Sequence, residues 1–355
     1  MLNIAQALRL STTSSAAFVG AGGKTTALFM TARQLAPALV ATTAHLGDWQ
    51  IAPADRHFIW AEDVPLPDIE AQIGTGITLI TGPLHADHRY SGLSFAQTEK
   101  LRQLAGYHDL PLLLEADGSR QKSLKAPAEH EPIIPSFVGI VVVVAGLSGL
   151  NQPLSDETVH RAGLFSALGG LGMGENVTAE ALARVLAHPQ GGLKNIPGGA
   201  RRLVLLNQAD TTELQAAAHS MAEALLQAYE AVIVAALSDG RPSTVDRELL
   251  SIARRPPSIF ARHDKIAGII LAAGEASRFG RPKQLLDYHG RPFVRAVAET
   301  ALAAGLSPVI VVTGAHAEMV ESALSDLPIT ITRNDEWKDG QSGAVKKGIN
   351  ALSSP

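Results

Sequence analysis

A glycine-rich segment at residues 20–26, with the sequence GAGGKTT, places the tightest constraint on the fold of this chain. It follows the apolar run 16–19 and precedes the apolar run 27–30, and a phosphate-binding loop requires this order of strand, loop and helix. Glycines allow successive backbone N–H groups to face one anion, a lysine adds positive charge, and a threonine hydroxyl suits magnesium. We therefore predict that a nucleotide binds here, through Gly20, Gly22, Gly23, Lys24, Thr25 and Thr26.

The match to the usual P-loop pattern is partial. Phe18 stands six positions before Lys24, where that pattern has glycine. An ordinary glycine-rich turn between a strand and a helix is therefore the alternative at this position.

The composition excludes several classes of function. With 355 residues, of which 46% are hydrophobic, the chain can bury more than one core. A formal net charge of -4 gives no basic surface for DNA or RNA, so we expect no nucleic-acid partner. No apolar segment is long enough for a membrane span, and we expect a cytoplasmic protein with no membrane partner. The lack of cysteine excludes disulfides, thiolate metal sites and a cysteine nucleophile.

Polar residues at the ends of two further predicted strands suit a metal ion. Thr43 ends a predicted strand at 38–43, and a second predicted strand, which starts at Leu110, ends in Glu115 and Asp117. Residues two apart in an extended chain face the same side, so both carboxylates should face the crevice at the carboxyl edge of the sheet. We therefore predict a magnesium site whose ligands are Thr25, Thr43, Glu115 and Asp117. A capped turn at Thr43 and a surface turn at Asp117 are the alternatives.

The sequence Asn-Gln-Ala-Asp at 207–210 follows a predicted strand. It resembles the guanine-reading element of P-loop GTPases, in which Asp accepts hydrogen bonds from the base and Asn braces the loop. We therefore predict nucleotide contacts from Asn207 and Asp210. Gln208 stands where those GTPases have lysine, so the choice between GTP and ATP stays open. The alternative is that Asp210 caps a helix predicted over 211–229.

Several spaced motifs together resemble the YqeC-type accessory proteins of selenium-dependent molybdenum hydroxylases. They are residues 20–26, Thr42-Thr43 with His45, residues 114–119, Lys125-Ala126-Pro127 with Glu131-Pro132, His160-Arg161 in a predicted helix from about Ser155, and residues 207–210. The resemblance covers about residues 1–255 and implies a P-loop fold and a role in maturing a selenium-containing molybdenum cofactor. Ala41 and Ala44 depart from the family's threonine run, and without cysteine the chain cannot carry selenium on a thiolate.

A second nucleotide-binding motif follows a basic, proline-containing segment at 254–263. An apolar run at 266–271 leads into the sequence AAGEASRFGRPK at 272–283. Small residues let the backbone wrap a triphosphate, and basic residues neutralise charge that grows as pyrophosphate leaves. We predict nucleotide contacts from Leu271, Ala272, Ala273, Gly274, Arg278 and Lys283, with Lys24, Arg278 and Lys283 as the catalytic candidates. A Rossmann-like turn with incidental basic residues is the alternative.

This second motif resembles the MobA-like nucleotidyltransferases, and within them most closely the molybdenum cofactor cytidylyltransferases. Further matches are Gln284-Leu285-Leu286, a predicted strand at 308–314, Asn334-Asp335 and residues 340–342, whereas Gly343 and Ala344 depart from the family's serines. The resemblance implies a CTP site. Residues 265–355 are few for a doubly wound domain, and the family's Asp-x-Pro acceptor segment is missing, so we expect an apparently truncated domain with weak or no cytidylyl transfer.

The sequence thus predicts an α/β protein with a P-loop NTPase-like, YqeC-like domain at 1–255, a linker at 256–264 and a partial Rossmann-like NTP-transferase domain at 265–355. The expected cofactors are Mg²⁺ and nucleoside triphosphates, GTP or ATP at the first site and CTP at the second. The expected partners are a molybdopterin cofactor and a molybdenum hydroxylase. Two alternatives to an accessory role are a cytidylyltransferase and a non-catalytic, nucleotide-gated chaperone of the hydroxylase.

Overall fold

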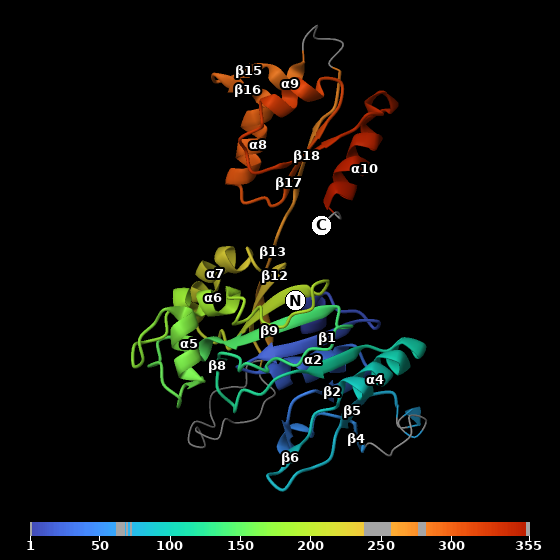
Figure 1. Cartoon of the computed structure of the whole chain (residues 1–355), viewed down its shortest axis with the longest axis vertical. Coiled ribbons are helices and arrows are strands. Elements are labelled where there is room, and N and C mark those ends of the chain that lie inside the picture. The colour runs from blue at the N-terminus through green and yellow to red at the C-terminus, as the bar shows by residue number, and fades with distance from the viewer. Residues whose placement is uncertain are drawn as a thin grey trace. The chain divides into compact units, whose positions relative to one another are not determined.

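The fold is described from a computed structural model, which defines residues 2–61, 68, 70–71, 73–237, 257–275 and 282–352. The chain divides into two compact units, Met1–Asp264 and Lys265–Pro355. Helices and strands alternate in both units (Figure 1), so the predicted α/β class is confirmed. No helix in the described ranges has the length and apolar character needed to cross a membrane.

The first unit is built on a sheet that has nine strands within the described ranges. Their order is β13 (Ser258–Asp264), β12 (Ala231–Ala236), β11 (Arg201–Asn207), β9 (Ile140–Gly146), β1 (Ser15–Gly20), β7 (Leu112–Glu115), β2 (Ala38–Thr42), β5 (Ile77–Thr81) and β4 (Arg56–Ile59). The strands pair in parallel except β13, which is antiparallel to β12. After β1 the chain forms β2, which lies on one side of β1 in the sheet, and it later forms β9 on the other side. Ligands in open α/β sheets bind at such a switch point, outside the carboxyl ends of the strands.

Helices cover both faces of this sheet. On one face lie α1 (Ile4–Leu8) and α2 (Lys24–Gln34), and on the other α4 (Phe95–Tyr107), α5 (Ala162–Gly169), α6 (Ala179–Ala187) and α7 (Thr212–Leu225). Short pairs of strands, β3 (Leu46–Gly47) with β6 (Arg89–Tyr90) and β8 (Leu124–Lys125) with β10 (Val159–His160), lie outside the main sheet, as do the single turns η1 (Asp48–Gln50) and η2 (Leu147–Gly149).

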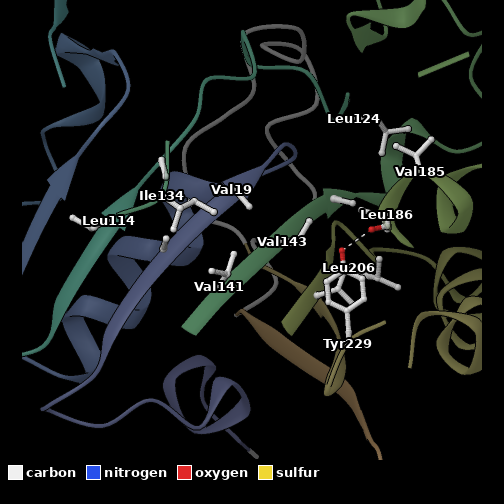
Figure 2. Packing of buried hydrophobic residues seen from close by; sticks show 14 of the residues in the cluster. Val19, Leu114, Leu124, Ile134, Val141, Val143, Val185, Leu186, Leu206 and Tyr229 are labelled. Atoms are coloured by element: carbon white, nitrogen blue, oxygen red, sulfur yellow. Dashed lines mark hydrogen bonds between the residues drawn. The ribbon is translucent and has the colours of Figure 1, made fainter. Parts of the chain in front are cut away.

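Alternating side chains of the central strands fill two apolar cores. Val19 of β1 joins the core under α4 to α7, whereas its neighbour Phe18 joins the core under α1 and α2. Figure 2 shows part of the first of these cores, to which Val143 of β9, Leu206 of β11 and Tyr229 belong. A strand covered on both faces needs apolar residues at every position, which explains the continuous apolar runs in the sequence.

The second unit contains a smaller parallel sheet in the order β14 (Gly268–Ala272), β17 (Val309–Thr313) and β18 (Thr330–Arg333). Residues of α8 (Phe293–Ala303) and α9 (Ala317–Ser322) share one core with this sheet, and α10 (Gln341–Leu352) contributes to the other. The remaining elements are a hairpin, β15 (Asp287–Tyr288) with β16 (Arg291–Pro292), and the turns η3 (Lys283–Leu285) and η4 (Trp337–Asp339).

The structure differs from the sequence prediction at the end of the first unit. Instead of belonging to a linker at 256–264, residues Ser258–Asp264 form β13, an edge strand of the large sheet. Pairing along β12 gives its backbone groups hydrogen-bond partners, although the segment is only partly buried. The sequence also predicts a helix at about 243–255, and these residues lie outside the described ranges.

A second difference concerns His160 and Arg161, which do not lie in a helix beginning near Ser155. His160 ends β10, where it pairs with Lys125 of β8. Arg161 is left-handed, with φ 63°, and α5 begins only after it. The backbone of β10 pairs with β8, and the Arg161 side chain binds Glu131. These long-range contacts override the local preference for a helix.

We predict that Tyr229→Phe destabilises the first unit. The buried Tyr229 hydroxyl donates to the Leu186 carbonyl oxygen at 2.7 Å, as the dashed line in Figure 2 shows. Removing the hydroxyl leaves that buried carbonyl without this donor, which should lower the free energy of unfolding by about 1–2 kcal/mol. Urea unfolding of both proteins measures the difference. The exposed Tyr107→Phe is the control and should change stability by less than about 0.5 kcal/mol.

Candidate functional site

The glycine segment forms a tight connection between the central strand and the helix that follows it. Strand β1 ends at Gly20 and α2 begins at Lys24. Gly20 and Gly22 have φ values of 99° and 77°, and a Cβ on either would come within 2.2 Å of the backbone of β9. Only glycine fits there. Phe18 is buried inside β1, so the loop begins later in the sequence than in the usual P-loop pattern.

The loop opens onto a large cavity. The N-cap residue of α2 is Gly23, which has no side chain with which to cap the helix. Unpaired N–H groups at the start of a helix, together with the helix dipole, attract anions. The cavity in front of them has a volume of about 1820 Å³, and its lining includes Gly22, Gly23, Lys24, Thr25 and Thr26 of the loop and helix. Single small-molecule sites commonly occupy about 300–1,000 Å³, so a nucleotide would leave room for a second ligand.

Lys24 is paired with protein groups in this structure. Its side chain is 3% exposed, and its Nζ donates to the Gly20 carbonyl oxygen at 2.8 Å. The same nitrogen lies 3.4 Å from a carboxylate oxygen of Asp117 and 3.9 Å from one of Glu115. The predicted phosphate-binding cation therefore lies at the carboxyl end of β7.

The structure brings two of the predicted metal ligands together. Thr25 Oγ1 donates to Glu115 Oε2 at 2.7 Å and accepts from Gln50 Nε2 at 2.7 Å. Burial raises the pKa of Glu115, against the opposing effects of the Lys24 charge and the Thr25 hydrogen bond. Hydroxyl and carboxylate oxygens are the ligands that Mg²⁺ prefers, and it commonly binds through one or two carboxylates plus substrate phosphates. Thr25 and Glu115 therefore fit a magnesium ion.

The other two predicted ligands make different contacts. Thr43 Oγ1 donates to the Ile133 carbonyl oxygen at 2.7 Å. Asp117 accepts from the Gly20 N–H at 2.9 and 3.0 Å and from Lys125 Nζ at 2.8 Å. No group of three or more histidine or acidic residues in the described ranges could by itself hold a metal.

A buried ion-pair network continues from Asp117 through residues whose role the sequence did not reveal. Lys125, with its side chain 3% exposed, also donates to the Gly118 carbonyl oxygen at 2.7 Å and to Glu131 at 2.8 Å. Arg161 then binds both oxygens of Glu131, at 2.8 and 3.0 Å. In the sequence these residues are isolated charges beside prolines or turns. They drew attention only as parts of the motifs that resemble the YqeC-type family.

This network shifts the pKa values of two groups. Burial alone would raise the pKa of Glu131, but hydrogen bonds and charge from Arg161 and Lys125 outweigh it and lower the pKa to about 2. Burial, followed by the charges of Arg161 and Lys125, lowers the pKa of His160 to about 4. Glu131 is therefore ionised and His160 neutral at neutral pH.

Asn207 joins the end of β11 to the glycine loop. It is buried, its Nδ2 donates to the Gly22 carbonyl oxygen at 2.8 Å, and its Oδ1 accepts from the Leu237 N–H at 2.9 Å. Asp210 is exposed, and the side chain that caps α7 belongs to Thr211. The alternative that Asp210 is the helix cap is therefore wrong. Gln208 lines the cavity and accepts from Ser148 Oγ at 2.6 Å.

In the second unit, the predicted nucleotide contacts lie around the end of β14. Leu271 and Ala272 end the strand, Ala273 and Gly274 follow it, Lys283 is exposed at the start of η3, and Arg278 lies outside the described residues. Gln284 Nε2 donates to the carbonyl oxygens of Ala272 and Gly274, at 3.1 and 2.8 Å.

Two polar side-chain atoms of the second unit are buried without a hydrogen-bond partner among the described residues, namely Gln284 Oε1 and Asn334 Nδ2. An unpaired buried donor or acceptor is costly, so such atoms in proteins usually bond to another protein group, a water or a ligand. The sequence had associated Gln284 and Asn334 with the nucleotidyltransferase resemblance but had not placed either in the site.

We predict that the Glu131 carboxylate makes the protein sensitive to acid. Its pKa of about 2 lies below its ordinary value of 4.5, so its stabilising contribution is complete above pH 4.5 and is lost as the pH falls toward 2. The full difference corresponds to at most about 3 kcal/mol. Unfolding free energies measured across this interval should fall less steeply in Glu131→Gln than in the wild type. Glu129→Gln, at an exposed neighbouring position, should retain the wild-type slope.

Comparisons with known proteins agree with this division of the chain. Residues 16–163 match the family described as YqeC protein, and residues 268–355 match the MobA-like NTP transferase domain. A curated relative named "Uncharacterized protein YqeC", from Escherichia coli (strain K12), is 32% identical over 218 residues, which are 59% of this chain and 81% of that protein.

Two further similarities cover shorter parts of the chain. Nicotine blue oxidoreductase from Paenarthrobacter nicotinovorans is 39% identical over 84 residues, which are 23% of this chain and 41% of that protein. A solved nucleotidyl transferase from Methanothermobacter thermautotroptrophicus is 32% identical, with a TM-score of 0.24, and the match covers 25% of this chain and 46% of that one. The chain thus spans less than half the length of each of these two proteins.

Proposed function

Because the chain belongs to the YqeC family and carries a MobA-like NTP transferase domain, we propose that it is a nucleotide-binding accessory protein for maturation of a selenium-containing molybdenum cofactor. One observation carries the nucleotide assignment. Lys24 and Thr25 lie at the uncapped start of α2, within reach of the buried Glu115, beside a cavity of about 1820 Å³. The cofactor assignment rests on the family resemblance.

At the first site we propose a P-loop NTPase-like arrangement. The N–H groups at the start of α2 bind the phosphates, and the Lys24 ammonium leaves its protein partners to neutralise them. Thr25 and Glu115 hold Mg²⁺, which neutralises charge on the phosphate oxygens when bound. Asn207 holds the loop against β11, and the exposed Asp210 reads the base of GTP or ATP.

At the second site we propose that the loop after β14 binds CTP, with Lys283 and Arg278 neutralising its triphosphate. The side chain of Gln284 bonds to Ala272 and Gly274, and its unpartnered Oε1, like the unpartnered Asn334 Nδ2, favours a polar ligand in this unit. Together with the family match over 268–355, they make cytidylyl transfer to a molybdenum cofactor the second candidate function.

The proposed setting is the cytoplasm, with the molybdopterin cofactor and a molybdenum hydroxylase as partners. A nucleotide-gated chaperone of that hydroxylase would use the same first site. It differs from an NTPase in releasing its partner on nucleotide binding while showing no hydrolysis above background.

We predict that GTP or ATP with magnesium stabilises the protein through the first site. At a nucleotide concentration of 100 times Kd, binding adds about 2.7 kcal/mol to the free energy of unfolding, which thermal denaturation detects as a higher Tm. Lys24→Ala should lose most of this gain, whereas Lys100→Ala, at an exposed position of α4, should keep it. A gain that survives intact in Lys24→Ala would contradict the assignment of the phosphate site.

We expect CTP to act independently of the first site. Its stabilising effect should persist in Lys24→Ala and disappear in Arg278→Ala or Lys283→Ala, because these two cations balance the triphosphate charge. Lys347→Ala, at an exposed position of α10, is the control. Titration calorimetry with CTP provides the measurement, and equal affinities in all these variants would rule out a CTP site at this loop.

A further inference from the structure

We infer that Asp117 is a positioning residue for the glycine loop, held in place by Lys125, and that Glu115 and Thr25 are the protein ligands of the cation. This inference rests on the proposed nucleotide site. It separates two carboxylates that the sequence pattern Glu-x-Asp makes equivalent, and it gives Lys125 a role in nucleotide binding.

The contacts of Asp117 occupy the positions that a metal would need. Both of its oxygens accept from the Gly20 N–H, at 2.9 and 3.0 Å, and Oδ2 also accepts from Lys125 Nζ at 2.8 Å. Lys24 Nζ lies 3.4 Å from Oδ1. An ionised carboxylate offers about four lone-pair positions, so little acceptor capacity remains. The side chain is 2% exposed, and its cost of burial is offset only while these partners stay in place.

Glu115 has different surroundings. Its Oε2 accepts from the Thr25 hydroxyl at 2.7 Å, whereas the contact of its Oε1 with Lys24 Nζ is 3.9 Å long. The Thr25 hydroxyl follows the phosphate-binding lysine directly, where a loop of this kind places its magnesium ligand. A cation that binds Thr25 and a phosphate therefore meets Glu115, and it can replace Lys24 as the positive charge beside that carboxylate.

Lys125 allows Lys24 to move. In this structure Lys24 is held by the Gly20 carbonyl oxygen and lies beside both carboxylates. When its ammonium turns to a phosphate, Asp117 keeps a buried cation in Lys125 and keeps the Gly20 N–H. Without Lys125, Asp117 would depend on Lys24 for charge balance and would compete with the phosphate for it.

The first test compares Asp117→Asn with Glu115→Gln. Calorimetry measures the Kd of whichever of GTP or ATP binds the wild type more tightly, with and without Mg²⁺. An Asn oxygen can still accept from the Gly20 N–H, so Asp117→Asn should keep the magnesium-dependent gain in affinity to within about threefold. In Glu115→Gln, the gain in affinity on adding Mg²⁺ should be at least about tenfold smaller than in the wild type. A tenfold loss in Asp117→Asn, or none in Glu115→Gln, overturns the assignment.

The second test concerns Lys125. Lys125→Met should weaken nucleotide binding by about tenfold, because the uncompensated Asp117 retains Lys24. Adding Asp117→Asn to Lys125→Met should restore the affinity of Asp117→Asn alone, because no carboxylate at position 117 then competes for Lys24. A double variant that binds as weakly as Lys125→Met contradicts the role of Lys125.

These measurements separate the inference from the proposal on which it rests. A wild-type protein that binds neither GTP nor ATP refutes the nucleotide site itself. Wild-type binding with an unchanged affinity in Lys125→Met refutes only the positioning role. If Lys125→Met does not fold, a double variant that folds and binds as Asp117→Asn does supports the role of Lys125, and one that does not fold contradicts it. The comparison of Asp117→Asn with Glu115→Gln still tests which carboxylate holds the cation, because both of these variants keep Lys125.

Discussion

The hydrogen bonds between the Asp117 carboxylate and the Gly20 N–H join the two strands on which the first unit depends. Asp117 lies two residues after the end of β7, and Gly20 ends β1, the neighbour of β7 in the sheet. The carboxylate is buried, and an isolated charge in that environment would be very unfavourable. Lys24 and Lys125 therefore lie beside it, at 3.4 and 2.8 Å. Through Lys125 the network extends to Glu131 and Arg161, so one buried charge determines the placement of several distant segments.

The glycine loop depends equally on close approach between backbones. The Ala21 N–H donates to the Val144 carbonyl oxygen at 2.8 Å, and the Gly22 N–H donates to that of Lys122 at 3.1 Å. Asn207 donates to the Gly22 carbonyl oxygen from the other side. Side chains on these glycines would separate the loop from β9, so the glycines are needed for packing as well as for phosphate access. The start of α2 is thereby held at the edge of the sheet where its N–H groups face the cavity.

The two units present their candidate sites by different physical means. In the first unit the charges are balanced within the protein, and a ligand must replace contacts that Lys24 already makes. In the second unit, the buried side-chain atoms Gln284 Oε1 and Asn334 Nδ2 have no hydrogen-bond partner among the described residues. An anion that binds Lys24 at the first site would therefore require a rearrangement of charge.

Local sequence determined much of this protein. The apolar runs and the glycine segment were enough to predict the α/β class, the strand-loop-helix order around Lys24 and the carboxylates that follow β7, because each depends on residues adjacent in the chain. The sequence also indicated two families, because motifs are recognised from residue types and their spacing and require no knowledge of contacts.

Only the tertiary structure decided which groups meet. Lys125, Glu131 and Arg161 are separated by turns in the sequence, yet they form one network because β8 pairs with β10. The segment 258–264 looks like a linker until β12 offers it hydrogen-bond partners. Glu115 and Asp117 look alike as a pattern, and they differ because one lies beside Thr25 and the other beside Gly20 and Lys125. Hydrogen bonds and ion pairs act over a few ångströms in space, and no separation along the chain specifies that distance.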